Sequence, residues 1–382
     1  MIKPLARPLC RWLARAALCT LCVPGALALA DASRSVQDAF GRSVPVPQPV
    51  TSMIAVGPGA LRLIVYLGRG SDVVGIEAIE GRGAAARPYA LALEHSLGAR
   101  PVDMLPLVGA GGPGRLPNLE QIRRLAPDVV VASFLDPAQI EQLQARTGVP
   151  VVAVSYGASY GGRADDAGPD RLVAWSSSIE QLGMVLQRPE RAGQLVAYMN
   201  DQRQSLGERL APAERNASVY IGGLGYRGAQ GLTSTEVGYP PFALLGLDNT
   251  VLASADRGEL GHRFIQLEAL IQSGPDWLFL DALAHPLIRD EWQRHRVLLQ
   301  FVPAVANAQV HWLVPTNSYN TNIENVFVNA HRIAHAMSDG APAPEAVARS
   351  IYATFLGDAA VETIMRRHYQ AYLDEAPLLN DE

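Results

Sequence analysis

The stretch NLEQIRRLAPDVVV at residues 118–131 recurs in pattern as QLEALIQSGPDWLFL at residues 266–280. Each copy predicts a helix of one to two turns, a Pro-Asp stop and a buried strand. Glu120 and Glu268 occupy the first helical turn, where the helix dipole favours an anion, and the proline ends the helix before the strand. Each glutamate also has a purely structural interpretation, because an acid is common at the start of a helix and two similar units would repeat it. Under either interpretation, the recurrence indicates two related lobes.

Short β-rich apolar runs alternate with helix-length segments around both copies. Alternation of this kind predicts a parallel sheet in each half, with the loops after the strands gathered at one edge. The fold class is therefore α/β, with two Rossmann-like lobes. The predicted strands cover residues 52–56, 73–76, 129–132 and 151–155 in the first half, and 218–222, 277–281 and 310–314 in the second.

A glycine-poor segment separates the two halves. Residues 172–210 are rich in Leu, Gln, Arg, Glu and Ala, and Pro189 is expected to open a second, longer helix. A helix of roughly 20 residues spans about 30 Å, which is enough to bridge two domains. We therefore predict an N-terminal lobe at residues 31–171, linking helices at 172–214, and a C-terminal lobe with closing helices at 215–382.

The N-terminus has the pattern of a secretory signal at residues 1–30. Basic residues precede an apolar run that ends at Ala28-Leu29-Ala30, and the run is shorter than the ~20 apolar residues that cross a bilayer. Cleavage after Ala30 and a soluble protein in the periplasm are therefore expected. All three cysteines lie in this segment, which excludes disulfides and cysteine metal sites from the mature chain.

Charge argues against a nucleic-acid partner. Cleavage removes four of the 32 basic residues and none of the 37 acidic ones, so the mature chain carries 28 basic residues and a net charge of −9. A chain with this balance is not expected to bind nucleic acid. Lys3 is the only lysine, so no Walker lysine remains after cleavage.

Beyond the repeat, the chain resembles the periplasmic binding proteins for siderophores, haem and vitamin B12. DAFGRSVPVP at residues 38–47 resembles that family's first hairpin, residues 54–75 its first βαβ unit, and PTNSYNTNIEN at 315–325 a branch that binds iron chelates. The resemblance covers nearly the whole mature chain. It implies two lobes joined by a single long rigid helix, with the ligand cleft between them.

The resemblance also implies a function. The chain would be the solute-binding component of an ABC importer, a monomer that captures an iron chelate or cobalamin and delivers it to a permease dimer in the inner membrane. It would not be an enzyme, and would have no catalytic residues, cofactor or resident metal. In that family a glutamate on each lobe docks against permease arginines, and by motif position these are Glu120 and Glu268. Charges of this kind at the rim of an interface mainly speed association and fix the relative orientation of the two proteins.

Ligands of open α/β sheets bind outside the carboxyl ends of the strands, so two facing lobes should present those loops to a shared cleft. Arginines pair bidentately with anionic groups and tyrosines cover flat apolar parts, which suits an anionic chelate. Taken singly, each residue is equally well explained by loop packing. The predicted ligand-binding residues are Arg62, Arg87, Tyr89, Tyr156, Tyr226, Arg227, Tyr239, Tyr319 and Asn320, with Arg87, Tyr226, Arg227 and Tyr319 preferred.

Other functions fit parts of the sequence. An oxyanion receptor for molybdate or tungstate could use backbone N–H groups at helix starts such as residues 57–59. GASYG at 157–161 matches the nucleophile elbow of a hydrolase, with Ser159 as nucleophile, but loop-forming residues follow where a helix must begin. His331 and His335 are spaced i, i+4 on a predicted helix, but the histidines do not lie at matching loops of both halves, which argues against a bare metal site.

Overall fold

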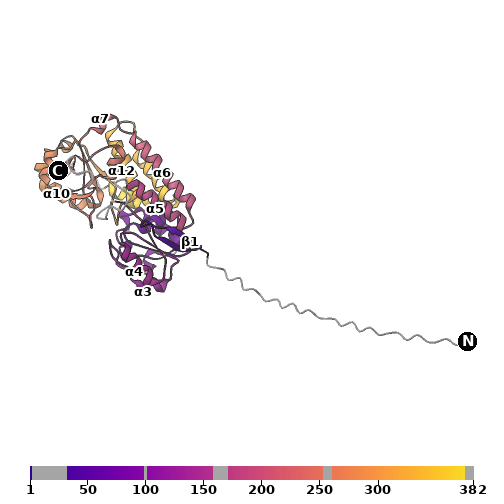
Figure 1. Cartoon of the computed structure of the whole chain (residues 1–382). Helices are drawn as coiled ribbons and strands as arrows, with labels where there is room; N and C mark the ends of the chain where they lie inside the picture. The colour runs from indigo at the N-terminus through magenta and orange to yellow at the C-terminus, as the bar shows by residue number, and fades with distance from the viewer. Residues whose placement is uncertain (2–31, 99–100, 158–170, 253–259, 375–382) are drawn as a thin grey trace.

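The computed structural model describes Met1 and residues 32–98, 101–157, 171–252 and 260–374. Ser159 and residues 2–30 of the predicted signal lie outside the described residues. Figure 1 shows two α/β units, with helices α5 and α6 running along one side. Within the described residues, no helix combines the length and the apolar character that a membrane crossing requires.

The first unit is built on a four-stranded parallel sheet in the order β4-β3-β5-β6. Every residue of β3, β5 and β6 is buried, because helices cover both faces of a parallel sheet. Its strands are β3 (Met53–Val56), β4 (Val73–Gly75), β5 (Val129–Ala132) and β6 (Val151–Ala153). Its helices are α1 (Ala60–Tyr66), α2 (Pro88–Leu97), α3 (Leu119–Leu125) and α4 (Pro137–Thr147).

An antiparallel hairpin precedes this sheet, as the resemblance implied. It consists of β1 (Ala32–Gln37) and β2 (Ser43–Gln48). The Asp38 carboxylate closes the turn, because its Oδ1 accepts from the backbone N–H groups of Phe40 and Arg42, each at 3.0 Å.

The second unit is built on a three-stranded parallel sheet in the order β11-β10-β7. An antiparallel ribbon, β8 paired with β9, lies beside it and was not predicted. The strands are β7 (Val219–Gly222), β8 (Ser234–Val237), β9 (Gly261–Phe264), β10 (Trp277–Asp281) and β11 (Val310–Leu313). The helices are α7 (Pro212–Arg215), α8 (Pro240–Leu245), α9 (Leu267–Ser273), α10 (His285–Leu299), α11 (Pro303–Ala306), α12 (Ile323–Met337), α13 (Pro344–Leu356), α14 (Val361–Ile364), a π-helix at Met365–Gln370 and α15 (Ala371–Leu373).

The repeated sequence unit folds in the same way in both sheets. Helices α3 and α9 end at left-handed residues, Ala126 with φ 43° and Gly274 with φ 55°. The aspartate of each Pro-Asp pair then holds the start of the neighbouring strand. Asp128 Oδ2 accepts from Thr51 N at 2.7 Å, and Asp276 Oδ2 accepts from Ser218 N at 3.2 Å. The Pro-Asp pair therefore ends a helix and also sets the register of two adjacent strands.

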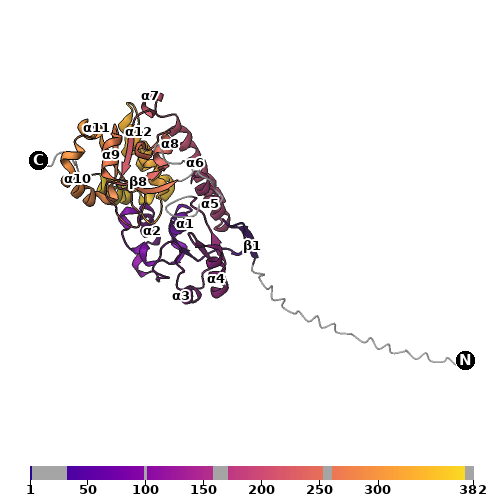
Figure 2. The same cartoon turned by 60° about the vertical axis from the view of Figure 1, so that its left-hand side comes forward.

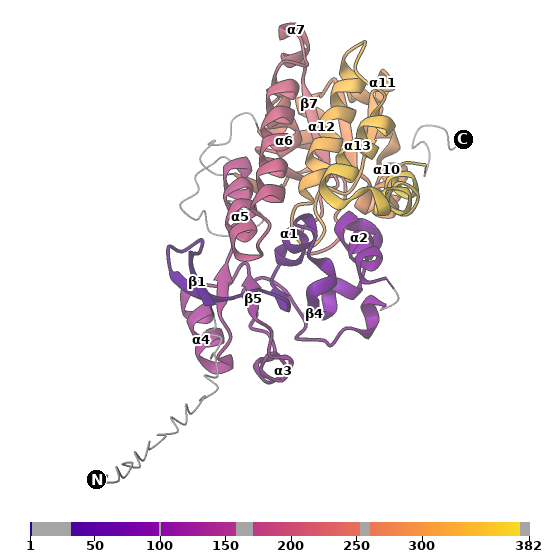
Figure 3. The same cartoon turned by 90° about the vertical axis from the view of Figure 1, so that its right-hand side faces the viewer.

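A pair of helices connects the two units. The residue pattern predicted two helices here, the second opened by Pro189, whereas the resemblance implied a single long helix. Helix α5 (Arg171–Val185) ends at a sharp turn, and the longer α6 (Pro189–Gly207) starts at the predicted proline. Gly183 permits their close packing, since an added Cβ would lie 2.4 Å from Ala192 Cβ. Figure 3 shows the two helices side by side. Near the start of α6, Arg191 donates to Tyr66 O at 3.0 Å and to Phe355 O at 3.2 Å, so it ties the first unit to α13.

Candidate functional site

The loops that follow the strands of the two sheets contact one another directly. In the first unit, residues 57–59 follow β3, Glu77 follows β4 and Tyr156 follows β6. In the second unit, residues 314–322 follow β11 and lead into α12. Figure 2 shows α1 and α2 where the two units meet. These loops follow strands of parallel sheets, so they lie where the strand-end rule expects a ligand to bind.

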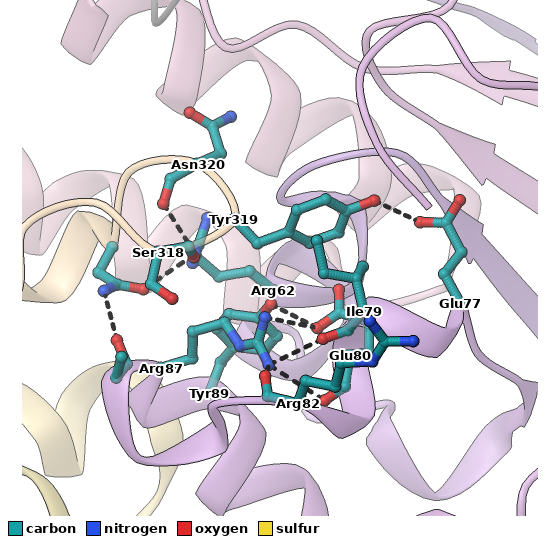
Figure 4. Close-up of polar contacts among 12 residues, drawn as sticks. Arg62, Glu77, Ile79, Glu80, Arg82, Arg87, Tyr89, Ser318, Tyr319 and Asn320 are labelled. Atoms are coloured by element: carbon teal, nitrogen blue, oxygen red, sulfur yellow. Dashed lines mark hydrogen bonds and ion pairs between the residues drawn. The ribbon is translucent and has the colours of Figure 1, made fainter. Parts of the chain in front are cut away.

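Arg62 lies at the centre of this contact (Figure 4). It projects from α1, is fully buried, and its guanidinium carbon lies 4.6 Å from the ring centre of Tyr89. Its Nη2 donates to the loop after β11, namely to Ser318 O at 3.2 Å, Asn320 O at 3.3 Å and Asn322 Oδ1 at 2.9 Å. Its Nε and Nη1 are buried without a hydrogen-bond acceptor. One guanidinium thus holds the two units together and leaves the N–H groups of two of its nitrogens without an acceptor.

Buried acids and hydroxyls surround Arg62. The Tyr66 hydroxyl donates to Glu324 Oε2, and the Tyr89 hydroxyl donates to Glu80 Oε2 at 2.7 Å. Burial raises the pKa of both glutamates, and nearby arginines oppose that rise. Burial acts to lower the pKa of Arg62, but the surrounding tyrosines and Glu324 outweigh it and raise this pKa. Arg62 therefore stays charged in a region shielded from water.

Tyr319 makes a second bond between the units. Its hydroxyl donates to Glu77 Oε2 at 2.7 Å and accepts from Gly112 N at 2.9 Å. The same Glu77 oxygen accepts from Gly57 N at 2.9 Å. Burial raises the pKa of Glu77 to about 7, although these two hydrogen bonds act against it.

The loop that carries Tyr319 has an unusual backbone. Tyr319 and Asn320 are consecutive left-handed residues, with φ of 52° and 78°. This conformation costs about 1–2 kcal/mol for an ordinary L-residue and less for asparagine. The contacts with Arg62 and Glu77 hold the loop in this shape, and backbone strain of this kind is concentrated at functional sites.

Arg87 and Tyr89 brace the loop that contains Glu80. Arg87 is buried, and its Nη2 donates to Ile79 O at 3.1 Å, to Glu80 O at 3.2 Å and to Arg82 O. Tyr89 lies in the first turn of α2. The ligand contacts of both residues remain predictions.

Tyr156 and Asn320 pack on the loop between β3 and α1. The Tyr156 hydroxyl donates to Gly59 O at 2.7 Å, and Asn320 Nδ2 donates to Pro58 O at 3.5 Å. Glycine is required at position 59, because an added Cβ would lie 2.6 Å from Tyr156 Cζ. Of the nine predicted ligand residues, this contact region brings together Arg62, Arg87, Tyr89, Tyr156, Tyr319 and Asn320.

The other three predicted residues lie within the second unit. Tyr226 and Arg227 are in the loop after β7, where Tyr226 is half-buried and Arg227 exposed. Tyr239 is buried, and its hydroxyl lies 2.8 Å from Thr316 Oγ1. The Thr316 N–H in turn donates to Asp281 Oδ2 at 2.7 Å. Tyr239 therefore contacts the loop after β11 through Thr316.

Sequence reasoning did not single out the buried carboxylates Glu77, Glu80 and Glu324, or the amide of Asn322. Asn322 donates to Ala86 O and to Pro315 O, both at 3.0 Å, and so connects the two units. Glu77 directly follows a predicted strand, and Glu324 opens the helix after the asparagine-rich stretch. Their positions at strand and helix ends were the only available signal.

Glu120 and Glu268 are exposed in the first turns of α3 and α9, at equivalent positions of the two units. His331 is buried and lies 2.7 Å from Gln202 Oε1, and burial lowers its pKa to about 4, so it is neutral. His335 is exposed. Across the described part of the chain, no three His, Cys, Asp or Glu residues are grouped to hold a metal ion.

A cavity of about 460 Å³ lies away from the contact region, beside α5, α6 and α8. Its lining includes Arg171, Arg203 and Pro240 and none of the predicted ligand residues. At the contact region itself, the loops of the two units touch through side chains, which is a closed arrangement.

Comparison with known proteins identifies the family. Residues 94–315 match the family described as periplasmic binding protein. The chain belongs to the periplasmic binding protein family. This periplasmic binding protein is 25% identical, over 232 residues, to the Fe(3+)-citrate-binding protein YfmC of Bacillus subtilis, and the match covers 57% of this chain and 68% of that protein. The family consists of binding proteins, so the expectation that the chain is not an enzyme is confirmed.

Solved structures share the fold of this periplasmic binding protein. A solute binding protein from Veillonella parvula has a TM-score of 0.66 at 17% identity, covering 90% of this chain and 99% of its own. MolA of Haemophilus influenzae, bound to molybdate, has a TM-score of 0.61 at 16% identity, covering 85% and 98%. FeuA of Bacillus subtilis, complexed with ferri-bacillibactin, has a TM-score of 0.54 at 13% identity, covering 80% and 98%. These likenesses confirm the α/β fold with parallel sheets.

Proposed function

We propose that this periplasmic binding protein is the solute-binding component of an ABC importer and captures an anionic iron chelate between its two lobes. The lobes would comprise residues 31–171 and 215–382, linked by 172–214. Family membership and the Fe(3+)-citrate-binding relative support this proposal. The observation that carries it is Arg62, a buried cation at the meeting point of both sets of strand-end loops.

The unused donors of Arg62 suit an anion. Nε and Nη1 are buried without acceptors, and an unpaired buried donor costs about 1–3 kcal/mol, more when it is charged. A carboxylate or other bidentate oxygen pair would accept from such a fork with good geometry. The loop at residues 318–322 covers Arg62 in the closed arrangement. Ligand entry therefore requires this loop to move away from α1.

Molybdate is the second candidate, because MolA binds it on the same fold. The backbone at residues 57–59 is the natural place for an oxyanion, but Gly57 N already donates to the Glu77 carboxylate. An oxyanion there would face a second negative charge whenever Glu77 is ionised. This contact favours a chelate held by Arg62 over an oxyanion held by the backbone.

Ligand binding tests the proposal directly. Thermal shift would be measured with ferric citrate, ferric siderophores, haem, cobalamin and molybdate, since a ligand at 100 times its Kd stabilises by about 2.7 kcal/mol. We expect a ferric chelate to stabilise the wild type, Arg62→Gln to lose the effect, and Arg123→Gln, an exposed arginine on α3, to keep it. A response to molybdate alone, or an unchanged response in Arg62→Gln, would overturn the proposal.

We further propose that the exported protein docks on the permease dimer through Glu120 and Glu268. Their exposure at equivalent positions of both units supports this role. The double variant Glu120→Arg/Glu268→Arg should abolish uptake of the labelled chelate in cells and leave its Kd unchanged. The matched control is Glu141→Arg/Asp290→Arg, which reverses two other exposed acids. Normal uptake in the first variant, or equal loss in both, would refute the docking role.

A further inference from the structure

Three rings of the second unit form a small aromatic surface, which we call the aromatic shelf: Tyr226, His262 and Phe264. We propose that this shelf, with Arg227 beside it, binds a planar aromatic anion, so the captured chelate carries aryl oxygen ligands of the catecholate type. This inference rests on the proposed function and narrows its ligand class.

The three rings contact one another in defined geometries. Tyr226 and His262 are stacked, with ring centres 4.3 Å apart and planes 7° from parallel. Phe264 stands edge-on to both, 4.5 Å from His262 at 77° and 6.3 Å from Tyr226 at 80°. Offset stacks and edge-to-face pairs are the favoured arrangements of aromatic rings. The shelf is thus a preorganised surface rather than a set of independent side chains.

Strand β9 and a serine on β8 fix the shelf. His262 and Phe264 are two residues apart on β9, so they project from the same face of the ribbon. The Ser234 hydroxyl donates its single hydrogen to Leu224 O at 2.6 Å, while its Oγ lies 2.7 Å from His262 Nε2. His262 Nε2 must therefore be the donor in that contact. Burial, together with Arg263, lowers the pKa of His262 to about 4, so the ring is neutral and stacks as an aromatic group.

Phe264 of the shelf and the neighbouring cation Arg227 are both exposed. Phe264 is 59% exposed, which is high for a phenylalanine that already contacts two rings. Arg227 is exposed, and its guanidinium carbon lies 5.4 Å from the ring centre of Tyr226. Arg227 also has a left-handed backbone with φ 54°, which an arginine rarely adopts. A flat anion could therefore stack on the rings while Arg227 neutralises its charge.

The shelf is next to the loop that contacts Arg62. Asn317 Nδ2 donates to Gly225 O at 2.6 Å, which joins the Tyr226 loop to the loop of residues 317–322. Leu224 N donates to Ser234 O at 3.2 Å, which fixes β8 and β9 at the carboxyl end of β7. The Tyr226 loop and Arg62 therefore both contact the loop of residues 317–322. A chelate with several aryl arms could place one arm on the shelf and the oxygens of another at Arg62.

Ring chemistry separates this ligand class from the alternatives. Citrate and molybdate have no π-face, so they gain nothing from stacking. Aromatic pairing typically contributes between about 2-fold and 10-fold in affinity beyond the area buried. The aryl preference should therefore depend on the ring at position 264 and not only on its apolar area.

The test compares Phe264→Leu, which keeps an apolar side chain without the ring, with Phe264→Tyr, which keeps the ring. Binding of the ferric complex of 2,3-dihydroxybenzoate and of ferric citrate would be followed by quenching of tryptophan fluorescence. Phe264→Leu should weaken binding of the aryl complex by between about 2-fold and 10-fold, and Phe264→Tyr should restore it. Ferric citrate should bind all variants equally. Phe301→Leu, at a phenylalanine that is 68% exposed elsewhere in the second unit, is the control.

The outcomes separate the two proposals. If the wild type binds ferric citrate but not the aryl complex, or if Phe264→Leu weakens both ligands equally, the aromatic shelf is refuted and the importer function stands. If the wild type binds neither of these two chelates nor any other iron chelate in the thermal-shift panel, the proposed function itself fails. Equal circular dichroism spectra and urea midpoints of the variants confirm that each one is folded.

Discussion

Glu77 makes the contact between the units dependent on pH. It is only 2% exposed, its Oε2 accepts from Gly57 N and Tyr319 Oη, and its Oε1 is buried without a partner. Burial raises its pKa from the ordinary 4.5 to about 7. The folded protein therefore binds this proton more tightly than the unfolded chain does. The resulting stability is fully present below about pH 4.5 and is lost as the pH rises through about 7.

The size of this effect follows from the pKa change. A factor of ten in proton affinity corresponds to about 1.4 kcal/mol, so a pKa that moves from 4.5 to about 7 corresponds to about 3.4 kcal/mol in all. Of this stabilisation, about 2.5 kcal/mol is lost from the wild type between pH 5 and pH 8. In Glu77→Gln the amide stands in for the protonated acid and does not titrate. As the pH rises from 5 to 8, the unfolding free energy of the variant should therefore increase by about 2.5 kcal/mol relative to that of the wild type.

Urea unfolding at pH 5, 6, 7 and 8, followed by tryptophan fluorescence, measures the difference in unfolding free energy between the two proteins. Taking the difference removes the titration of other buried groups, such as Asp281, whose pKa burial raises to about 7, and His368, whose pKa burial lowers to about 4. Glu141→Gln, at an exposed glutamate on α4, is the control and should give a constant difference. If the wild type gains stability over Glu77→Gln as the pH rises, then the hydrogen bonds from Gly57 and Tyr319 outweigh burial, and the reasoning is wrong.

Two further substitutions test the packing of the contact region. Arg62→Met should lower the unfolding free energy by about 3–5 kcal/mol in urea titrations, because it leaves buried carboxylates without their cation. The control Arg123→Met, at an exposed site, should change the unfolding free energy by less than about 0.5 kcal/mol. Gly59→Ala and Gly68→Ala both place a side chain at positive φ, 85° and 70°, but only Gly59 faces a ring, that of Tyr156. We expect about 1 kcal/mol of destabilisation for Gly68→Ala and about 1–3 kcal/mol more for Gly59→Ala, and equal losses would contradict the clash.

The most strongly patterned parts of the fold were predictable from the sequence. Strands β5 and β10 have the predicted bounds, and α3 is the short helix that the repeat predicted, because the repeated unit combines a helix-start acid, a Pro-Asp stop and a run of apolar residues. The same pattern predicted parallel sheets, since a helix separates successive strands. Pro189 likewise marked the start of α6.

The ribbon of β8 and β9 was not predictable in the same way. Its sequences, STEV at residues 234–237 and GHRF at 261–264, are polar, and only long-range pairing makes them strands. Ser234, Thr235 and Glu236 are fully buried because hydrogen bonds and an ion pair satisfy them, as in Glu236 with Arg171 at 2.5 Å. Hydrophobic periodicity carries no information about strands buried by polar contacts. The aromatic shelf depends on this ribbon and was missed for the same reason.

At the candidate site, the sequence predicted where the residues lie better than it predicted which groups they hydrogen-bond. Residues after parallel strands do gather at one edge, which is why Arg62, Tyr156 and Tyr319 lie together. Residue type could not reveal that Arg87 would donate to the carbonyl groups of its own loop, because an arginine donates equally well to a ligand or to a nearby turn.

The contact region gathers buried charges of both signs from the two units. Two buried arginines, Arg62 and Arg87, face three buried glutamates, Glu77, Glu80 and Glu324. Burial raises the pKa of all three glutamates, so proton binding brings the negative charge of this region closer to balance with the two arginines. An anionic chelate at Arg62 would disturb this balance unless a carboxyl group takes up a proton. Burial has already raised the pKa of Glu324, which hydrogen-bonds Tyr66 beside Arg62, so we expect ligand capture and proton uptake to be coupled there.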